Sequence, residues 1–157
     1  MSHAGKSMSG RVGVVLVLHG AAGDALVEAI ADVIGAPASG GLGWAVVDHA
    51  QAETREALVR RVAEAAAEVD GGAGILYVSD LYGATPGNVC ADAAAAARAG
   101  GWPVEVLFGV NLAMLVKLAS LDRALLTPSE LAAGALETAR RTVRALRETG
   151  EPYERTR

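Results

Sequence analysis

The sequence predicts an α/β protein with a mostly parallel sheet between layers of helices. Short apolar runs, typical of strands buried on both faces, alternate with longer segments whose apolar residues recur at helical spacing. The resulting order, β-α-β-α-β-α-β-α followed by another helix, is that of an α/β sandwich. The chain has 157 residues, the size of one domain, which we expect at residues 11–150 between a disordered leader at 1–10 and a flexible tail at 151–157.

The first half of the chain supplies two strands and two helices. Residues 12–18 are a continuous apolar run, predicted to be a buried strand, and a glycine-rich turn follows at 19–23. A helix ended by Gly35 comes next, because apolar residues recur at helical spacing: Leu26, Val27, Ile30, Val33 and Ile34. Residues 43–47 form a second, shorter strand, and residues 53–69 form an amphipathic helix.

The third strand and its helix follow a glycine-rich loop. The strand spans residues 75–78. We expect Thr85 to cap the next helix, with Pro86 at its first position, because a side-chain oxygen followed by proline is a common helix start. The alanine-rich body of this helix runs to Arg98 and stops at two glycines.

One more strand and two helices complete the pattern. The strand spans residues 104–108, and a short helix begins at Asn111. At residues 127–130 the sequence Thr-Pro-Ser-Glu matches a capping box, which opens a C-terminal helix that we expect to run to about Arg147.

Composition and charge exclude several classes of protein. With 52% hydrophobic residues the chain is too apolar to be disordered, yet it has no apolar run long enough to span a bilayer. A net charge of −4 without a dense basic stretch leaves no footprint of nucleic-acid binding. One cysteine excludes internal disulfides and multi-cysteine metal sites, and the N-terminus lacks the apolar stretch of a signal peptide. We expect a cytoplasmic protein without direct membrane insertion, metal or cofactor.

The best candidates for chemistry are His19 and Asp80. In α/β folds, ligands bind beyond the carboxyl ends of the strands. His19 directly follows the first predicted strand, and Asp80 closes the third. If these strands are neighbours, the two side chains emerge side by side, and a carboxylate on one ring nitrogen leaves the other as an unprotonated nucleophile. Taken singly, each residue has a plain alternative: packing for the histidine and turn capping for the aspartate.

Small and polar residues beside this pair predict an anion site. Gly20 opens the turn before the first helix, whose N-terminus presents backbone N–H groups. Gly83, Thr85 and Asn88 supply further backbone or side-chain donors at the start of the third helix. Turn formation and helix capping are the alternative roles for these residues, and for Asn111 we favour the cap.

Other motifs are interpreted as structural. Gly5-Lys6-Ser7 resembles the end of a phosphate-binding loop, but no strand precedes it, and no GxGxxG pattern follows the first strand. Cys90 is expected to pack in the interior. His3 lies in the leader and His49 in a polar turn, and we expect no function for either.

Three segments together resemble the mannose-type EIIA domain of the bacterial phosphoenolpyruvate-dependent sugar phosphotransferase system. The first, residues 12–20, is a strand ending in His-Gly; the second, 79–88, reads Ser-Asp-Leu-Tyr-Gly-Ala-Thr-Pro-Gly-Asn; the third, 109–115, reads Gly-Val-Asn-Leu-Ala-Met-Leu. The similarity covers roughly residues 11–147, with the motifs in the same order and at compatible spacing. Each motif alone is weak, whereas the ordered set is specific.

The resemblance implies a doubly wound sheet with helices on both faces, and homodimers that exchange an edge strand. It also implies that the phosphocarrier HPr phosphorylates His19 on Nε2, that Asp80 holds the other ring nitrogen, and that Thr85 lies at the phosphate site. An EIIB-type partner would then accept the phosphoryl group. Two alternatives stay open: a regulatory module that signals through phosphorylation of His19, and the phosphotransfer subunit of a dihydroxyacetone kinase.

Overall fold

The computed structural model describes residues 10–36 and 42–145, and its centre is a sheet of parallel strands. In this part of the chain the strand order is β2-β1-β3-β4, built from β1 (Gly13–His19), β2 (Ala45–His49), β3 (Ile75–Ser79) and β4 (Val104–Leu107). The expected leader, apart from Gly10, lies outside the described residues with His3 and the Gly5–Ser7 motif, as does the expected tail at 151–157.

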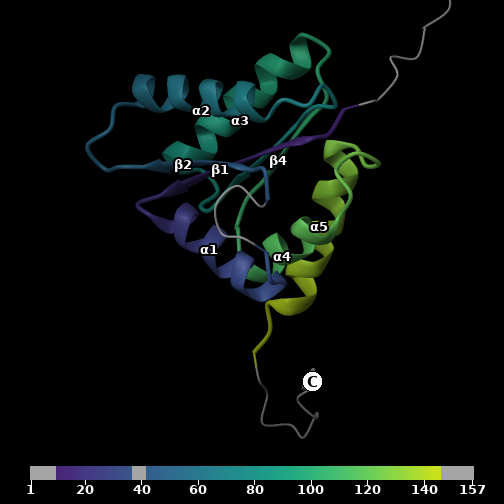
Figure 1. Cartoon of the computed structure of the whole chain (residues 1–157). Coiled ribbons are helices and arrows are strands. Elements are labelled where there is room, and N and C mark those ends of the chain that lie inside the picture. The colour runs from purple at the N-terminus through teal and green to yellow at the C-terminus, as the bar shows by residue number, and fades with distance from the viewer. Residues whose placement is uncertain (1–9, 37–41, 146–157) are drawn as a thin grey trace, which may run out of the picture.

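Helices cover both faces of this sheet, so the predicted doubly wound α/β fold is confirmed (Figure 1). One layer consists of α2 (Arg55–Val69) and α3 (Thr85–Ala99). The opposite layer consists of α1 (Ala22–Ile34), α4 (Leu112–Ser120) and α5 (Pro128–Thr142). Parallel neighbours require a crossover between them, and the helices provide it.

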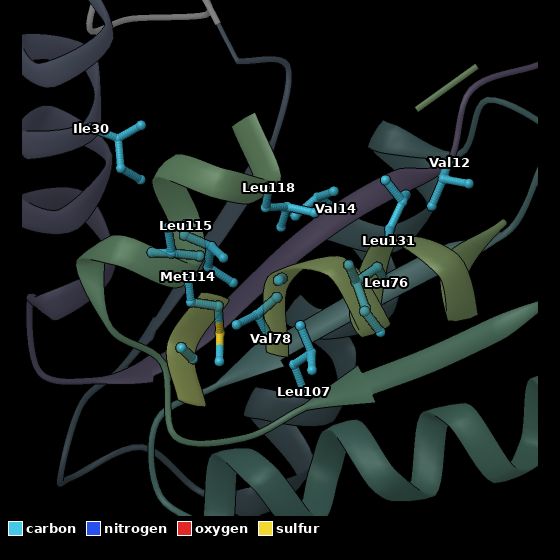
Figure 2. Close-up of a cluster of buried hydrophobic side chains, with 14 of the residues drawn as sticks. Val12, Val14, Ile30, Leu76, Val78, Leu107, Met114, Leu115, Leu118 and Leu131 are labelled. Atoms are coloured by element: carbon cyan, nitrogen blue, oxygen red, sulfur yellow. The ribbon is translucent and has the colours of Figure 1, made fainter. Parts of the chain in front are cut away.

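The central strand β1 explains why residues 12–18 read as an unbroken apolar run. Successive side chains of a strand point to opposite faces. Leu16 and Leu18 belong to the hydrophobic cluster beneath α1, α4 and α5, part of which is drawn in Figure 2. Val15 and Val17 belong to the cluster beneath α2 and α3. Both faces of β1 are therefore buried. His19, which follows Leu18, lies at the end of this firmly packed strand, where the chain leaves the core.

The start of α3 differs from the expectation that Thr85 caps it. The N-cap is Ala84, in extended conformation, and Thr85 is the first helical residue, without a side-chain capping bond. The reason lies in the preceding turn. The N–H of Ala84 donates to the carbonyl of Leu81 at 3.2 Å, which closes the turn one residue before Thr85. Pro86 then falls at the second helical position, where a missing N–H also costs no intrahelical bond.

Two other predicted caps are confirmed. Oδ1 of Asn111 accepts the N–H of Met114 at 2.9 Å, which caps α4. Thr127 and Glu130 form the capping box of α5, since Thr127 Oγ1 accepts the Glu130 N–H at 3.2 Å and Glu130 Oε2 accepts the Thr127 N–H at 2.8 Å.

The C-terminal end of α5 differs from the expectation. The helix ends at Thr142, before the predicted end near Arg147. Val143 is extended and exposed, so no apolar contact supports a further turn of helix at this point.

Candidate active site

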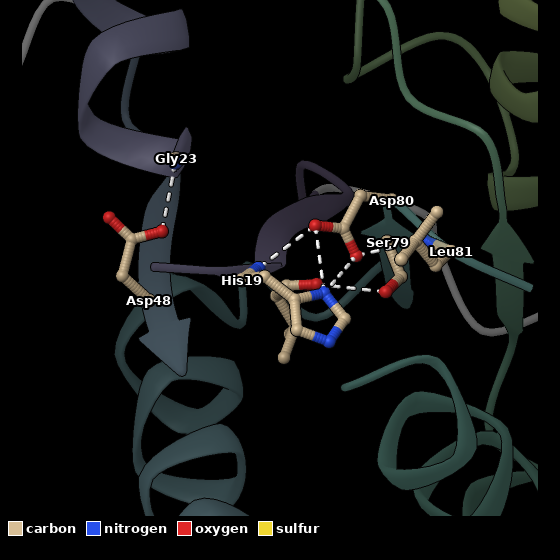
Figure 3. A network of polar contacts seen from close by, with 7 residues as sticks. His19, Gly23, Asp48, Ser79, Asp80 and Leu81 are labelled. Carbon is tan, nitrogen blue, oxygen red and sulfur yellow. Dashed lines mark hydrogen bonds and ion pairs between the residues drawn. The ribbon is translucent and has the colours of Figure 1, made fainter. Parts of the chain in front are cut away.

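His19 and Asp80 meet where β1 and β3 end. The two strands pair in parallel, with Val17 opposite Ser79, so Asp80 emerges beside His19. The ring Nδ1 of His19 lies 2.9 Å from Oδ1 and 3.1 Å from Oδ2 of Asp80 (Figure 3). The backbone N–H of His19 also donates to Oδ2, at 2.9 Å. The side-by-side placement expected from the sequence is therefore present in the structure.

Hydrogen bonds decide the protonation of this pair. Burial by itself raises the pKa of the Asp80 carboxyl. The backbone and ring of His19, together with the N–H of Leu81 at 2.8 Å from Oδ1, outweigh burial and hold that pKa below its usual range. An ionised carboxylate only accepts hydrogen bonds, so the hydrogen of a neutral His19 ring sits on Nδ1. The lone pair is then left on Nε2, which points away from Asp80 (Figure 3).

The backbone around Asp80 is held on both sides. Ser79 is fully buried, and its hydroxyl donates to the carbonyl of Val17 at 2.9 Å. The carbonyl of Asp80 accepts the N–H of Gly109 at 2.9 Å, and that of Ser79 accepts the N–H of Val110 at 3.3 Å. These bonds fix the carboxylate relative to the ring, while the His19 side chain remains 41% exposed and within reach of a partner.

Asp48 already binds two N–H groups at the N-terminus of α1, which differs from the expectation that the first helix presents its N–H groups to an anion. The carboxylate of Asp48, on β2, accepts the N–H of Gly23 at 2.8 Å (Figure 3). It also accepts the N–H of Asp24 at 3.3 Å. The N–H of Gly20 donates to the backbone carbonyl of His49 at 3.0 Å. Gly20 has φ +63°, a conformation that favours glycine, and a Cβ there would meet no atom within 4 Å.

The β3–α3 loop, by contrast, carries helix-start donors. Gly83 has φ +83°, the left-handed region, and its carbonyl accepts the side-chain Nδ2 of Asn88 at 3.1 Å. Thr85 is exposed at the first position of α3. The N–H groups of Thr85 and Gly87 belong to the first turn, where no intrahelical acceptor exists. Asn88 thus braces the loop with its amide, and the N–H groups of the exposed Thr85 and the buried Gly87 have no acceptor within the helix.

His49 joins the site, which the sequence analysis did not anticipate. It lies opposite His19 in the β1–β2 pairing, and the two ring centroids are 6.1 Å apart at an interplanar angle of 66°. Both rings line a hollow of about 460 Å³ together with Gly20 and Gln51. The sequence held one sign of this, because each histidine comes at or near the end of an apolar run, as expected for the last residue of a strand. The second strand was predicted to end at residue 47, so His49 was interpreted as part of a turn.

The remaining candidates have structural roles. Cys90 is fully buried, as predicted, and burial, with a smaller effect of the Asp80 charge, raises the pKa of its thiol to about 12. Across residues 10–36 and 42–145, no three or more His, Cys, Asp or Glu side chains gather so as to hold a metal ion. None of the helices in these same ranges has the length and apolar character needed to cross a membrane.

Comparison with known sequences identifies relatives of the chain. The EIIA-man family model, described as "PTS system fructose IIA component", matches residues 13–136. The PTS system mannose-specific EIIAB component of Escherichia coli (strain K12) is 32% identical over 139 residues, which are 87% of this chain and 40% of the relative. The chain thus spans about two fifths of the length of the curated relatives it matches.

Solved structures share the fold. The mannose/sorbose specific IIA subunit of the phosphotransferase system from Enterococcus faecalis superposes with a TM-score of 0.68 at 24% identity, over 93% of this chain and 99% of that one. The phosphotransferase system component EIIA from Streptococcus agalactiae gives 0.66 at 20% identity, over 85% and 96%. The family model matches most of the length of the chain, and this match shows that the chain belongs to the EIIA-man family, as an EIIA-type component of the sugar phosphotransferase system.

Proposed function

We propose that this chain is a histidine phosphocarrier that accepts a phosphoryl group from phospho-HPr on Nε2 of His19 and passes it to an EIIB-type partner. One observation carries the proposal: the Asp80 carboxylate contacts Nδ1 of His19, whereas no hydrogen bond from the described residues reaches Nε2, on a side chain that is 41% exposed. A histidine arranged in this way needs no base to become a nucleophile, because the attacking nitrogen holds a lone pair at the start of the reaction.

The transfer itself is a nucleophilic displacement at phosphorus. The Nε2 lone pair of His19 attacks the phosphorus of the donor's phosphohistidine. The donor's N–P bond breaks, and its electron pair stays on the donor ring. The His19 ring keeps its hydrogen on Nδ1 and so becomes positively charged, and the Asp80 carboxylate at 2.9 Å offsets that charge. Transfer to an EIIB-type acceptor is the same displacement with His19 as the leaving group.

The phosphoryl oxygens need donors, and the start of α3 supplies them in this proposal. The N–H groups of Thr85 and Gly87 and the hydroxyl of Thr85 would bind the oxygens. Gly83 and Asn88 would act by shaping the loop that carries these donors, since the Asn88 amide bonds the Gly83 carbonyl. Gly20 would contribute space beside the His19 ring, because a Cβ at this position meets nothing within 4 Å.

Exposed apolar side chains beside the site suit docking of the two protein partners. Leu81 is 59% exposed and Tyr82 is 85% exposed, and these are the next two residues after Asp80. The Tyr82 ring packs edge-on against Phe108, with ring centroids 5.1 Å apart. A partner that covers this patch removes water from around His19 during transfer, which strengthens the interaction of its charges.

The test is phosphorylation of the purified chain. The protein is incubated with phosphoenolpyruvate, enzyme I and HPr, and its intact mass is recorded beside a His19→Ala variant and a sample without HPr. An acid-labile phosphoryl group gained only by the wild type, and only with HPr, is expected. No gain by a folded wild type with active HPr, or an equal gain by His19→Ala, contradicts the proposed function.

A further inference from the structure

A second imidazole in the hollow has the same hydrogen-bonding arrangement as His19. Nδ1 of His49 lies 3.1 Å from Oε2 of Glu53, just as Nδ1 of His19 lies 2.9 Å from Asp80. Within the described residues no hydrogen bond reaches Nε2 of His49, and no unpaired side-chain nitrogen or oxygen there is sealed from solvent. His49 also lines the hollow beside His19, so its Nε2 is open to solvent and available to a ligand.

The charges around His49 are well defined. Glu53, which precedes α2, also accepts Nη1 of Arg61 at 2.9 Å and 3.0 Å. The hydrogen bond from Arg61 lowers the pKa of the Glu53 carboxyl more than any other influence, so this carboxylate is ionised at neutral pH. Asp48 is committed to the N-terminus of α1, and His19 to Asp80. Among the described residues, the titratable groups in direct contact with the His49 ring are the Glu53 carboxylate, which also binds Arg61, and the His19 ring.

We propose that His49 binds the phosphoryl group carried by His19: His49 takes up a proton from solvent as the group arrives and donates its Nε2–H to a phosphoryl oxygen. The inference rests on the proposed function. The two ring centroids lie 6.1 Å apart, a separation comparable to the combined reach of a phosphoryl group on His19 and one hydrogen bond of about 3 Å. Protonated His49 then donates from both nitrogens, to Glu53 and to the phosphoryl oxygen, and each acceptor is anionic.

Exposure argues that His49 binds the phosphoryl group rather than receiving it from a partner. The His49 side chain is 11% exposed, against 41% for His19. Transfer between proteins requires an in-line approach of the donor, which the more exposed ring allows. The more buried ring lies beside it, where it can stabilise charge without meeting the donor.

The test compares variants with two phosphoryl donors. Wild type, His49→Leu and His49→Gln are phosphorylated with phospho-HPr and with phosphoramidate, a small donor that needs no protein docking. Glu56→Gln is the matched control, because Glu56 is an exposed residue in the first turn of α2 and does not line the hollow. Circular dichroism verifies that each variant is folded, and peptide mapping locates the phosphoryl group.

His49→Leu is expected to slow phosphorylation of His19 about 10- to 100-fold with both donors, as for a lost hydrogen bond to a charged group. His49→Gln keeps an N–H of similar reach and is expected to recover most of the rate, and Glu56→Gln is expected to stay within about twofold of wild type. An unchanged rate in His49→Leu, a loss seen only with phospho-HPr, or a phosphoryl group mapped to His49 overturns the inference.

A measurement without variants covers the case in which His49→Leu fails to fold. In ¹⁵N NMR spectra of the wild type, the His49 ring is expected to become protonated on Nε2 when His19 is phosphorylated, and no change overturns the inference. Failure of the proposed function looks different: the wild type gains no phosphoryl group, or His19→Ala still gains one. A phosphorylated wild type whose His49 does not respond contradicts only the role of His49.

Discussion

Asp80→Asn is expected to slow phosphoryl transfer to His19 severely while leaving the fold in place. The two carboxylate oxygens serve two backbone donors, because Oδ2 accepts from the His19 N–H and Oδ1 from the Leu81 N–H. Both oxygens also lie within 3.1 Å of Nδ1 of His19. An amide has one oxygen and one NH₂ group, so it cannot serve every donor.

The magnitude follows from that mismatch. In either orientation of the amide, one backbone N–H faces an NH₂ group, which costs about 1–3 kcal/mol of stability for a partly buried donor. The NH₂ group also donates to Nδ1, which moves the ring hydrogen to Nε2 and removes the lone pair that attacks phosphorus. We expect transfer to fall by about 10²- to 10⁴-fold, the upper end being typical of an orienting carboxylate replaced by its amide.

Two measurements on the same variant separate rate from stability. Rapid-quench transfer of labelled phosphate from phospho-HPr gives the rate, and urea unfolding gives the stability. Asp92→Asn is the matched control, because Asp92 is an exposed aspartate of α3 paired with Arg55, away from His19. It is expected to transfer at the wild-type rate. Transfer by Asp80→Asn at the wild-type rate would refute the role assigned to this carboxylate.

Three further predictions concern stability. Because hydrogen bonds lower the pKa of Asp80 despite its burial, its contribution to stability is present above the usual carboxyl pKa and is lost as pH falls through the folded-state value. Urea midpoints measured from about pH 6 to about pH 3 should therefore fall less steeply in Asp80→Asn, and parallel curves would contradict this. Arg123 is 6% exposed and donates to backbone carbonyls just before β1 and β2, so Arg123→Met should cost about 2–4 kcal/mol in urea unfolding, whereas a loss below about 1 kcal/mol would contradict the role of these bonds. Thr127→Ala removes the cap of α5 and should cost about 1 kcal/mol, with Thr138→Ala, inside the same helix, as the control that should cost less.

Much of the fold follows from local patterns in the sequence. A strand covered on both faces needs apolar side chains along its length, and Val12 and residues 14–18 have them, so β1 was predictable without any knowledge of its neighbours. The caps at Asn111 and Thr127 were predictable because each bond joins residues three apart in the chain. The pairing of His19 with Asp80 needed one further assumption, that β1 and β3 are adjacent, and they are.

The parts that were not predicted depend on contacts between distant segments. Asp48 caps α1 from another strand, so the sequence around Gly23 gives no sign that its N–H is already bound. His49 reaches His19 through the register of β1 and β2, which a boundary error of two residues concealed. Thr85 was misassigned because the turn before it closes at Ala84, and a threonine before a proline looks the same in either position.

The central claim is that the phosphoryl group is carried by one nitrogen of one ring. Long-range ¹H–¹⁵N correlation spectra of the ¹⁵N-labelled protein, recorded before and after phosphorylation by phospho-HPr, report on that nitrogen directly. The structure predicts a His19 ring with its hydrogen on Nδ1 in the free protein, and phosphorus coupled to Nε2 with that hydrogen retained afterwards. Phosphorus on Nδ1 of His19 or on any other residue, or a free ring with its hydrogen on Nε2, would contradict the account.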